Sequence, residues 1–367
     1  MNLSRIKIYG AGSIGNHLAN AARTLGMSVC VVDRDREALR RMREEIYPAR
    51  YGRWDESIEQ FDGNNDPEGG FDLICVGTPP AAHVPLALKA LKEKPKAIQV
   101  EKPLCMPDMA SASELRQLAQ QNGVKVFVGY DHVVGKSARQ AVEMVKSGVI
   151  GDVLTLDVEF REFWGGIFAA HPWLAGPHDS YLGFWKQGGG ASGEHSHALN
   201  LWQYLAREFG FGRVSKVDAL MSYVTNERVD YDELCSLHVT TDTGFCGRVI
   251  QDVVTQPVRK VAIIQGSKGT LTIHVSHSKA GDALILHLTG QEPVITPVAK
   301  TRPDDFIEEL KHIDASLNAG APVSPLDLNY GLDTMLVVAA AHRSHTEGRR
   351  MVLPTPPDYS LDSLRFA

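Results

Sequence analysis

The feature that most constrains the fold is the glycine pattern Gly10-Ala11-Gly12-Ser13-Ile14-Gly15, which separates two segments of different periodicity. Residues 5–9 before it predict a short strand, and residues 14–25 after it carry apolar side chains at helical spacing. In this context the first glycine permits a tight turn, the second lets the backbone approach a pyrophosphate, and the third lets helix pack on strand. We therefore expect a dinucleotide site at the N-terminus of this helix, formed by Gly10, Gly12, Ser13, Ile14 and Gly15.

Strands and helices alternate through the rest of the first third of the chain. Apolar strand-like runs cover residues 28–32, 73–76, 97–100 and 125–128, and helical spacing covers residues 36–45, 85–91 and 109–122. Residues 55–72 are acidic and rich in glycine and asparagine, which indicates a surface loop. The alternation predicts an α/β fold that begins with a doubly wound parallel sheet, an NAD(P)-binding Rossmann domain over residues 1–130.

The pattern changes near residue 130. After a predicted helix over residues 137–147, strand-like runs joined by short turns dominate up to residue 288, and helical spacing returns over residues 304–319 and 331–346. A chain of 367 residues is too long for one ordinary hydrophobic core. Over residues 131–367 we predict a substrate-binding and oligomerisation α+β domain with a large, mostly antiparallel sheet, whose C-terminal helices can pack back on the first domain.

The charge and the cysteines limit the classes of function. A net charge of −6 and a pI near 6.2 disfavour a nucleic-acid partner, which needs a basic face. No apolar run approaches the roughly 20 residues that cross a bilayer, and no signal-peptide pattern opens the sequence, so we expect no membrane partner. Five cysteines without a Cys-x-x-Cys pair indicate thiols in a reducing compartment, and we expect a cytoplasmic protein.

Asp33 closes the second predicted strand and bears on the choice of cofactor. A carboxylate there can accept hydrogen bonds from both ribose hydroxyls and repels a 2′-phosphate, which favours NAD over NADP. Arg34 leaves the NADP alternative open, because its guanidinium can stack on adenine or reach a phosphate.

Lys102 follows the predicted strand over residues 97–100, within the segment Glu101-Lys102-Pro103. A lysine at the carboxyl end of a strand in a dinucleotide-binding unit brings an ammonium to the place where a nicotinamide and its substrate meet. Lys102 therefore turns a prediction of cofactor binding into a hypothesis about a reaction.

Further motifs follow in a fixed order. They are Thr78-Pro79 with His83 behind it, Glu101-Lys102-Pro103, Gly148-Val149-Ile150-Gly151, Gly188-Gly189-Gly190 before a histidine-rich helix start, and the late segment from Phe306 to Arg349. In this order and spacing the chain resembles the Gfo/Idh/MocA family, which contains glucose–fructose oxidoreductase and inositol dehydrogenase relatives. The resemblance implies a Rossmann domain followed by a domain with a large open sheet, through which members form homodimers or homotetramers.

The same resemblance implies an oxidoreductase that transfers a hydride between a nicotinamide cofactor and a secondary alcohol or ketone of a sugar, sugar derivative or polyol. It identifies Lys102 as the catalytic lysine, whose charge can stabilise a developing alkoxide. It also adds Thr78, Pro79, His83 and Glu101, together with Lys102 itself, to the expected cofactor contacts.

The segment Glu194-His195-Ser196-His197 departs from the family pattern, which has an Asp, a His four residues later and an Asp three beyond. His197 and Asn200 match the last two positions, whereas Glu194 lies only three residues before His197, as a one-residue deletion would leave it. Residues three apart share one face of a helix, so we expect Glu194, His197 and Asn200 to act together.

We assign His197 as the general acid/base, because histidine titrates near neutral pH. Glu194 would orient it or bind a substrate hydroxyl, and Asn200 would hydrogen-bond the substrate. On a continuous helix His195 points about 200° away from His197, which favours a capping or core histidine, although His195 stays a candidate for substrate contact and for the proton transfer.

Residues 160–185 hold three of the five tryptophans of the chain. Flat aromatic faces suit the C–H faces of sugar rings, and segments of this kind also cover interfaces. We expect Trp173 and Trp185 to contact the substrate, with Tyr130 lining the site just after the sixth strand. The His-x-His pair has no cysteine or carboxylate set at ligand spacing beside it, so we expect no metal.

Three functions remain open at this point. The first is an NAD-dependent dehydrogenase with a carbohydrate substrate; the second is a glycosidase that retains NAD and uses transient oxidation; the third is a non-catalytic NAD-binding sensor. Net formation of NADH separates the first from the second, and the presence of both Lys102 and His197 argues against the third.

Overall fold

The protein is represented by a computed structural model that describes residues 2–169, 171 and 173–367. The chain forms two compact units. The first comprises the residues up to Leu104 with Ser111–Asp131 and Arg302–Asn329, and the second comprises Cys105–Ala110, His132–Thr301 and Tyr330–Ala367. The chain passes from the first unit to the second near residue 131, where the sequence pattern changes. The helix over Arg302–Ser316 belongs to the first unit again.

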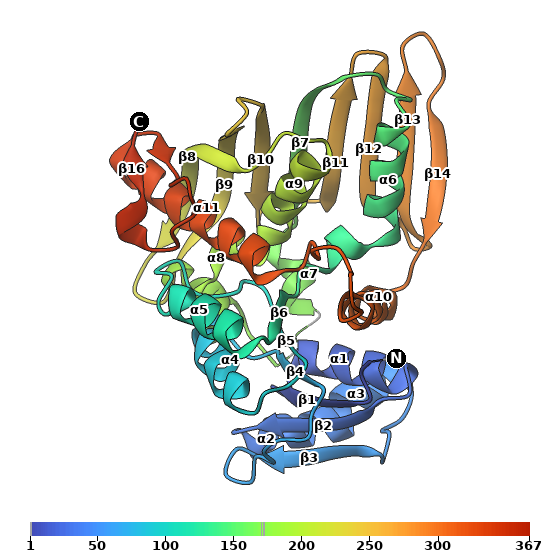
Figure 1. Ribbon diagram of the computed structural model, residues 1–367, viewed down its shortest axis with the longest axis vertical. Coiled ribbons are helices and arrows are strands. Elements are labelled where there is room, and N and C mark those ends of the chain that lie inside the picture. Colours follow the sequence, from blue (N-terminus) through green and yellow to red (C-terminus); the bar gives the residue numbers. More distant parts are fainter. Residues whose placement is uncertain (1, 170, 172) are drawn as a thin grey trace. The chain divides into compact units, whose positions relative to one another are not determined.

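The first unit is built on six parallel strands in the order β3-β2-β1-β4-β5-β6, visible in the blue and cyan part of Figure 1. The strands are β1 Arg5–Tyr9, β2 Ser28–Asp33, β3 Ile58–Asp62, β4 Leu73–Val76, β5 Ala97–Val100 and β6 Lys125–Val128. The helices are α1 Ser13–Thr24, α2 Arg36–Arg41, α3 Tyr47–Tyr51, α4 His83–Lys92, α5 Ala112–Asn122 and α10 Arg302–Ser316. The predicted doubly wound parallel sheet is confirmed. Its strand order reverses between β1 and β4, and sheets of this kind bind ligands at the carboxyl ends of the strands beside such a reversal.

Strand β3 corrects the prediction of a loop over residues 55–72. It lies at the edge of the sheet and pairs only with β2, and Ile58 is the one residue of the strand that is buried. An edge strand needs few apolar side chains, because one side of its backbone faces solvent or a loop. Its polar composition therefore concealed it.

The second unit contains a ten-stranded sheet in the order β14-β13-β12-β11-β7-β10-β9-β8-β15-β16, in which β7 and β10 are parallel and the other neighbours are antiparallel. The strands are β7 Val153–Arg161, β8 Val214–Thr225, β9 Asp230–Thr241, β10 Cys246–Asp252, β11 Arg259–Gly266, β12 Gly269–Ser278, β13 Gly281–Leu288, β14 Val294–Ala299, β15 Met351–Val352 and β16 Arg365–Phe366. The large, mostly antiparallel sheet is as predicted. The edge strand β14 was not predicted, because it contains Pro297 and exposes Val294 and Ile295, both of which an edge strand tolerates.

Helices cover one face of this sheet. They are α6 Lys136–Lys146, α7 Trp164–Ala169, α8 Gly190–Glu194, α9 Ser196–Glu208 and α11 Leu328–Glu347. Figure 1 shows α6 and α9 lying across the sheet, with α9 packed on β7 and β10 and α6 on β12 and β13. Buried aliphatic residues such as Leu199 and Val158 fill the layer between helices and strands.

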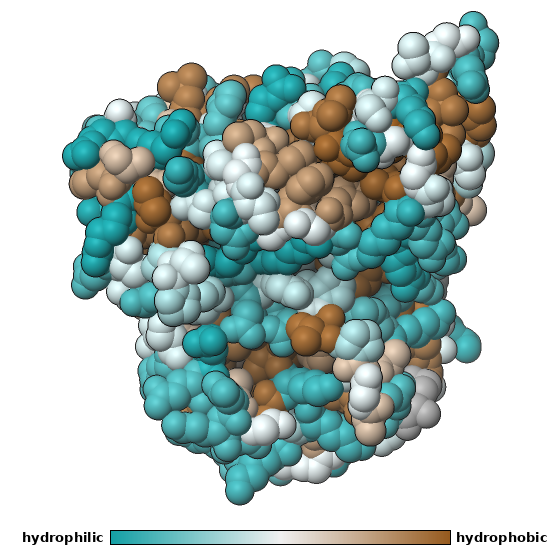
Figure 2. Space-filling model, turned by 45° about the horizontal axis from the view of Figure 1, so that its top comes forward, coloured by the Kyte–Doolittle hydropathy of each residue, from teal (hydrophilic) through white to brown (hydrophobic). Residues whose placement is uncertain are grey.

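The surface is mostly polar. Figure 2 shows that hydrophilic residues predominate on the visible face, with hydrophobic residues in several groups between them. Among the described residues, no helix is both long enough and apolar enough to pass through a membrane. All five cysteines are free thiols, four of them buried.

Candidate active site

The glycine loop has the geometry that its sequence predicts. Gly10 has φ +106°, and a Cβ there would lie 2.7 Å from the carbonyl oxygen of Gly77, so the loops after β1 and β4 touch through backbone atoms. A Cβ at Gly15 would lie 1.9 Å from the carbonyl oxygen of Gly10, whereas a Cβ at Gly12 would meet nothing within 4 Å. The loop is therefore closed on its protein side and open at Gly12, which fits the approach of a pyrophosphate to the N-terminus of α1.

Side chains beside the loop hold it in place. The amide of Asn16 donates to the carbonyl oxygen of Gly12 at 2.8 Å. Ile14 is half-buried, and its Cγ2 would lie 3.4 Å from a Cβ at Gly77. The loop is thus fixed by its own helix and by the loop that follows β4.

Asp33 ends β2 and is half-buried beside the glycine loop. Its Oδ2 accepts the backbone N–H of Ala11 at 2.8 Å, and its Oδ1 accepts that of Asp35 at 2.9 Å. The carboxylate therefore also has a structural role that the sequence did not reveal. Arg34 is exposed.

Arg50 is a residue of this site that the sequence reasoning missed. From α3 its guanidinium donates to Ser13 twice, to the hydroxyl at 2.9 Å and to the carbonyl oxygen at 3.0 Å, and burial lowers its pKa. It brings a cation to the first turn of α1, where the helix dipole already favours an anion. In the sequence it stands in an arginine- and glutamate-rich stretch that resembles an ordinary solvated helix face.

His83 connects the loops that follow β4 and β5. It is 1% exposed, and its two ring nitrogens lie 2.6 Å from the carbonyl oxygen of Thr78 and 2.8 Å from that of Pro103. Burial lowers the pKa of His83 to about 4, against the hydrogen bonds to the carbonyl oxygens of Thr78, Pro103 and Leu104, which raise it. His83 thus fixes the backbone on either side of the expected nicotinamide position, and Pro79 caps the short 3-10 helix Pro80–Ala82 next to Thr78.

Lys102 lies directly after β5 and is half-buried. Glu101 before it is 5% exposed and accepts a hydrogen bond from Gln99 Nε2 at 2.8 Å. The Lys102–Pro103 peptide bond is cis. Tyr130, expected to line the same site from the end of β6, is 1% exposed.

The second group of predicted residues lies where α8 meets α9, and here the helix is interrupted. Helix α8 ends at Glu194 and α9 begins at Ser196, with His195 between them at φ −96° and ψ 21°. The expectation that Glu194 and His197 share one face of a continuous helix was wrong. Gly193, near the end of α8, packs against the backbone that precedes this helix, where a Cβ would lie 2.1 Å from the carbonyl oxygen of Gly188.

The two histidines have different surroundings. His197 is half-buried, and its ring meets that of His132 edge to face with centroids 4.8 Å apart. His195 is 3% exposed and stands at the N-cap of α9 without a side-chain capping bond, so of the two structural roles expected for it the core histidine is the correct one. From the resemblance we also expect His132, which like Tyr130 follows the sixth strand, to line the site, and its ring contacts that of Phe160 as well.

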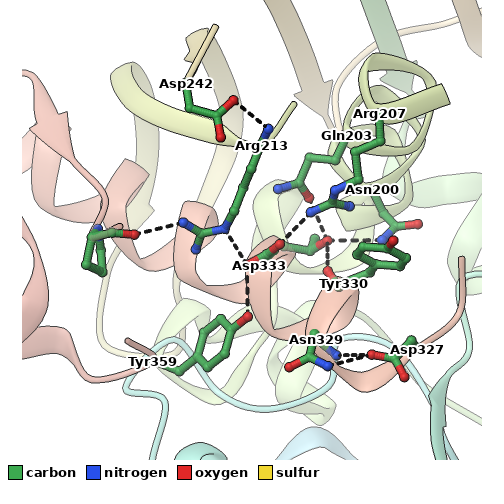
Figure 3. A network of polar contacts seen from close by, with 12 residues as sticks. Asn200, Gln203, Arg207, Arg213, Asp242, Asp327, Asn329, Tyr330, Asp333 and Tyr359 are labelled. Atoms are coloured by element: carbon green, nitrogen blue, oxygen red, sulfur yellow. Dashed lines mark hydrogen bonds and ion pairs between the residues drawn. The ribbon is translucent and has the colours of Figure 1, made fainter. Parts of the chain in front are cut away.

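Asn200 faces α11 rather than open space. It is 2% exposed, and its Nδ2 donates to Thr334 Oγ1 at 3.0 Å, which in turn donates to Gln203 Oε1 at 2.7 Å (Figure 3). This helix-to-helix contact uses the amide nitrogen that we expected to bind substrate. The spacing of Asn200 from His197 could not reveal the partner, because Thr334 is 134 residues away.

The two tryptophans differ as well. Trp173 is 37% exposed and lies edge-on to His171. Trp185 stacks on His342 of α11 with centroids 4.2 Å apart and lines a cavity of about 480 Å³ in the second unit, together with Ala339 and Arg343.

A series of buried polar side chains fixes the ring of His342 through both of its nitrogens. Tyr223 Oη lies 2.6 Å from its Nδ1 and Ser192 Oγ lies 3.1 Å from its Nε2, while Ser192 also donates to Asp232. Burial raises the pKa of Asp232 to about 8 and lowers that of His342 to about 3. This chain ties α8 to β9 and α11, and none of its members stands out in the sequence.

Comparison with known proteins matches both parts of the chain. A family model described as "Oxidoreductase family, NAD-binding Rossmann fold" (GFO_IDH_MocA) matches residues 4–130, and a model of the GFO/IDH/MocA C-terminal domain matches residues 138–272. The comparison with curated proteins finds no match.

Solved structures of similar fold cover nearly the whole chain. Levoglucosan dehydrogenase in complex with NADH and levoglucosan is 18% identical with a TM-score of 0.75, covering 96% of this chain and 99% of its own. Aldose-aldose oxidoreductase from Caulobacter crescentus is 20% identical with a TM-score of 0.75, covering 96% and 100%. The WlbA dehydrogenase from Bordetella pertussis, in complex with NADH and UDP-GlcNAcA, is 18% identical with a TM-score of 0.72, covering 96% and 98%. At these identities the likeness establishes the fold.

Proposed function

Because the chain belongs to the Gfo/Idh/MocA family of oxidoreductases, we propose that it is a dehydrogenase that transfers a hydride between NAD and a secondary alcohol or ketone of a sugar, sugar derivative or polyol. The observation that carries the proposal is Lys102. It directly follows β5, at the same carboxyl edge of the parallel sheet as the glycine loop after β1. The carbohydrate named for the levoglucosan dehydrogenase structure supports the proposed substrate class.

Each proposed residue has its own role in the reaction. NAD, when bound, accepts or returns the hydride. In the oxidation direction, Lys102 donates a hydrogen bond to the substrate oxygen and stabilises its developing negative charge. His197 takes up the hydroxyl proton, so that the alcohol becomes a ketone as the hydride leaves carbon. Glu194 orients His197 or binds a neighbouring hydroxyl, and the contacts of Tyr130, Trp173, Trp185, His195 and Asn200 with substrate belong to the same proposal.

The preference for NAD over NADP rests on Asp33. Its carboxylate lies at the end of β2 beside the open Gly12 position, where it can accept from the ribose hydroxyls. Thr78, Pro79, His83, Glu101 and the exposed Arg34 complete the proposed cofactor surroundings.

Asp33→Asn is expected to raise the Kd for NAD about tenfold and to reduce the discrimination against NADP, because a neutral amide binds the ribose hydroxyls less tightly and no longer repels a phosphate. Asparagine keeps an oxygen that can accept the Ala11 N–H, so the loop is preserved. Titration calorimetry with NAD and NADP measures both effects. Asp35→Asn is the matched control, and an unchanged Kd in Asp33→Asn would contradict the ribose assignment.

His197→Gln is expected to lower kcat about 10²-fold, because glutamine cannot accept the proton at neutral pH. His195→Gln is the matched comparison, since its side chain is buried two residues earlier and is expected to affect stability more than turnover. Steady-state kinetics with thermal unfolding of each variant separates the two effects. A larger loss of kcat in His195→Gln, at equal stability, would move the acid/base role to His195.

A screen of sugars, inositols and nucleotide sugars with NAD and with NADP, followed by absorbance of the reduced cofactor, tests the proposed function. Net NADH formation with one of them is the expected result. Release of a sugar without net NADH would instead indicate an NAD-retaining glycosidase, and NAD binding without either reaction a sensor. As part of the same proposal, copies of the chain associate through the face of the ten-stranded sheet opposite α6 and α9, where half-buried Glu159 and Arg161 alternate with buried residues along β7.

A further inference from the structure

Two carboxyl side chains and an amide are buried together in the first unit next to Lys102. Glu101 is 5% exposed, and Glu309 of α10 and Gln99 of β5 are 0% exposed. Gln99 bridges the two carboxyls, since its Nε2 donates to Glu101 Oε1 at 2.8 Å and to Glu309 Oε1 at 3.3 Å. Glu309, 210 positions from Gln99 in the sequence, thus contacts β5, the strand that precedes Lys102.

The backbone at the end of β6 closes over this group. A Cβ at Gly129 would lie 2.6 Å from Glu101 Oε1 and 2.9 Å from Gln99 Nε2. Only a glycine leaves room for the pair. The carboxyls are therefore enclosed by protein and solvated by few polar neighbours.

Two acceptor atoms in this group have no hydrogen-bond partner within the described part of the chain. They are Gln99 Oε1 and Glu309 Oε2, and neither is reached by solvent. Each belongs to a planar group whose other end already takes part in the Gln99–Glu309 contact. A proton on Glu309 Oε2 would give the amide oxygen a donor, and the two side chains would then pair as an acid with an amide.

We propose that Glu309 keeps its proton in the folded protein and, paired with Gln99, acts as a positioning residue that fixes Glu101 and thereby Lys102. The effect on Lys102 rests on the proposed function, whereas the protonated state of Glu309 does not.

The charges around Glu101 and Glu309 favour a state in which the two carboxyls share at least one proton. Burial raises the pKa of Glu309 well above its ordinary value, and the charges of Glu101 and Asp131 act in the same direction. Burial also raises the pKa of Glu101 to about 7, against the hydrogen bond from Gln99. The charged groups that act on the two carboxyls include Lys102 and Arg302, which favour ionised Glu101, Asp131, which disfavours a charge on either carboxyl, and Asp305, which disfavours a charge on Glu309. Glu101 is therefore the member that ionises first as pH rises, and Glu309 is the member that keeps its proton.

Glu309→Gln tests the protonated state without reference to activity. Glutamine reproduces the protonated acid, with an oxygen that accepts from Gln99 and an NH₂ that donates to it. In the natural chain, unfolding lets Glu309 ionise above about pH 4.3, so the folded state holds one more proton and loses stability as pH rises. The unfolding equilibrium constant of the natural chain should then rise about tenfold per pH unit relative to that of Glu309→Gln.

Urea denaturation of both full-length proteins, in steps from about pH 5 to pH 8, measures this ratio. Glu308→Gln is the matched control one residue earlier in α10, where half-buried Glu308 pairs with exposed Lys311, and its ratio to the natural chain should stay flat. A flat ratio for Glu309→Gln would show that Glu309 is ionised when folded and would overturn the proposal.

Kinetics tests the positioning role with the carbohydrate that gives the fastest NADH formation in the screen. Glu309→Gln should keep kcat within about threefold, and Glu309→Leu, which leaves Gln99 without its partner, should lower kcat at least tenfold with the Kd for NAD within about twofold. Equal losses in the two variants would overturn the positioning role. A failure of the proposed function is distinguishable from a failure of this proposal. If Lys102→Ala kept full turnover, the proposed function would be wrong, but the unfolding equilibrium constant of the natural chain would still rise with pH relative to that of Glu309→Gln.

Discussion

Lys102→Ala is expected to lower kcat about 10³-fold while the Kd for NAD changes less than about threefold, because the ammonium acts on charge that develops only in the transition state. The side chain follows β5, and the loops that fix the cofactor are held by other groups, Asp33 on Ala11 and His83 between Thr78 and Pro103. Their contacts do not depend on Lys102. Steady-state kinetics and calorimetric titration of NAD measure the two quantities on the same preparation.

Lys96→Ala is the matched control for this prediction. It stands before β5, at the amino end of the strand that Lys102 follows, and pairs with Asp72 at the surface. Its loss should leave kcat and the Kd for NAD unchanged within about twofold. If Lys102→Ala weakened NAD binding as much as it lowered kcat, Lys102 would be a structural residue of the loop, and the assigned reaction would lose its main support.

Asp333→Ala is expected to lower the free energy of unfolding by about 3–5 kcal/mol, because it leaves two cations without their counter-charge in a buried setting. Asp333 of α11 is 4% exposed and accepts hydrogen bonds from Arg207, from Arg213 Nε at 2.7 Å and from the hydroxyl of Tyr359 at 3.1 Å (Figure 3). The two arginine side chains are themselves mostly buried, at 18% and 15% exposure. Urea denaturation followed by circular dichroism measures the loss.

Asp218→Ala supplies the comparison, since Asp218 pairs with Arg350 in a salt bridge whose side chains are 41% and 50% exposed. An exposed pair contributes at most about 1 kcal/mol, so this variant should unfold close to the natural midpoint. Asp333→Asn, which keeps an acceptor oxygen but not the charge, should fall between the two. Equal stability of Asp333→Ala and Asp218→Ala would mean that the network contributes no more than a surface pair.

Much of the fold follows from periodicity, and the strands that were missed lie at the edge of a sheet or are very short. The alternation of strand and helix signals over residues 5–128 predicted five of the six strands of the parallel sheet, and the strand-rich pattern after residue 150 predicted the mostly antiparallel sheet. The strands β3 and β14 were missed because both are edge strands, and β15 and β16 were missed because each has only two residues. An edge position relaxes the demand for buried side chains on which such predictions depend.

In the candidate site, features set by a short sequence motif could be predicted, whereas contacts between distant segments could not. The backbone conformation of Gly10 and Gly15 follows from a short motif whose geometry is encoded locally. The contacts of Arg50 with Ser13, of Asn200 with Thr334 and of Gln99 with Glu309 join segments far apart in the chain, and no spacing rule brings them together. The break at His195 was also missed, because the spacing of Glu194, His197 and Asn200 is that of a continuous helix.

Helix α10 belongs to the first unit although the whole sheet of the second unit precedes it in the chain. It packs on α1, where Phe306 stacks on His17 at 4.7 Å, and it supplies Glu309 to the group beside Lys102. During synthesis the first 131 residues therefore leave the ribosome before α10 exists, and chains are made at about 5–20 residues per second. The contact between α1 and α10 can form only after residue 316 has been added, when most of the second unit has already been synthesised.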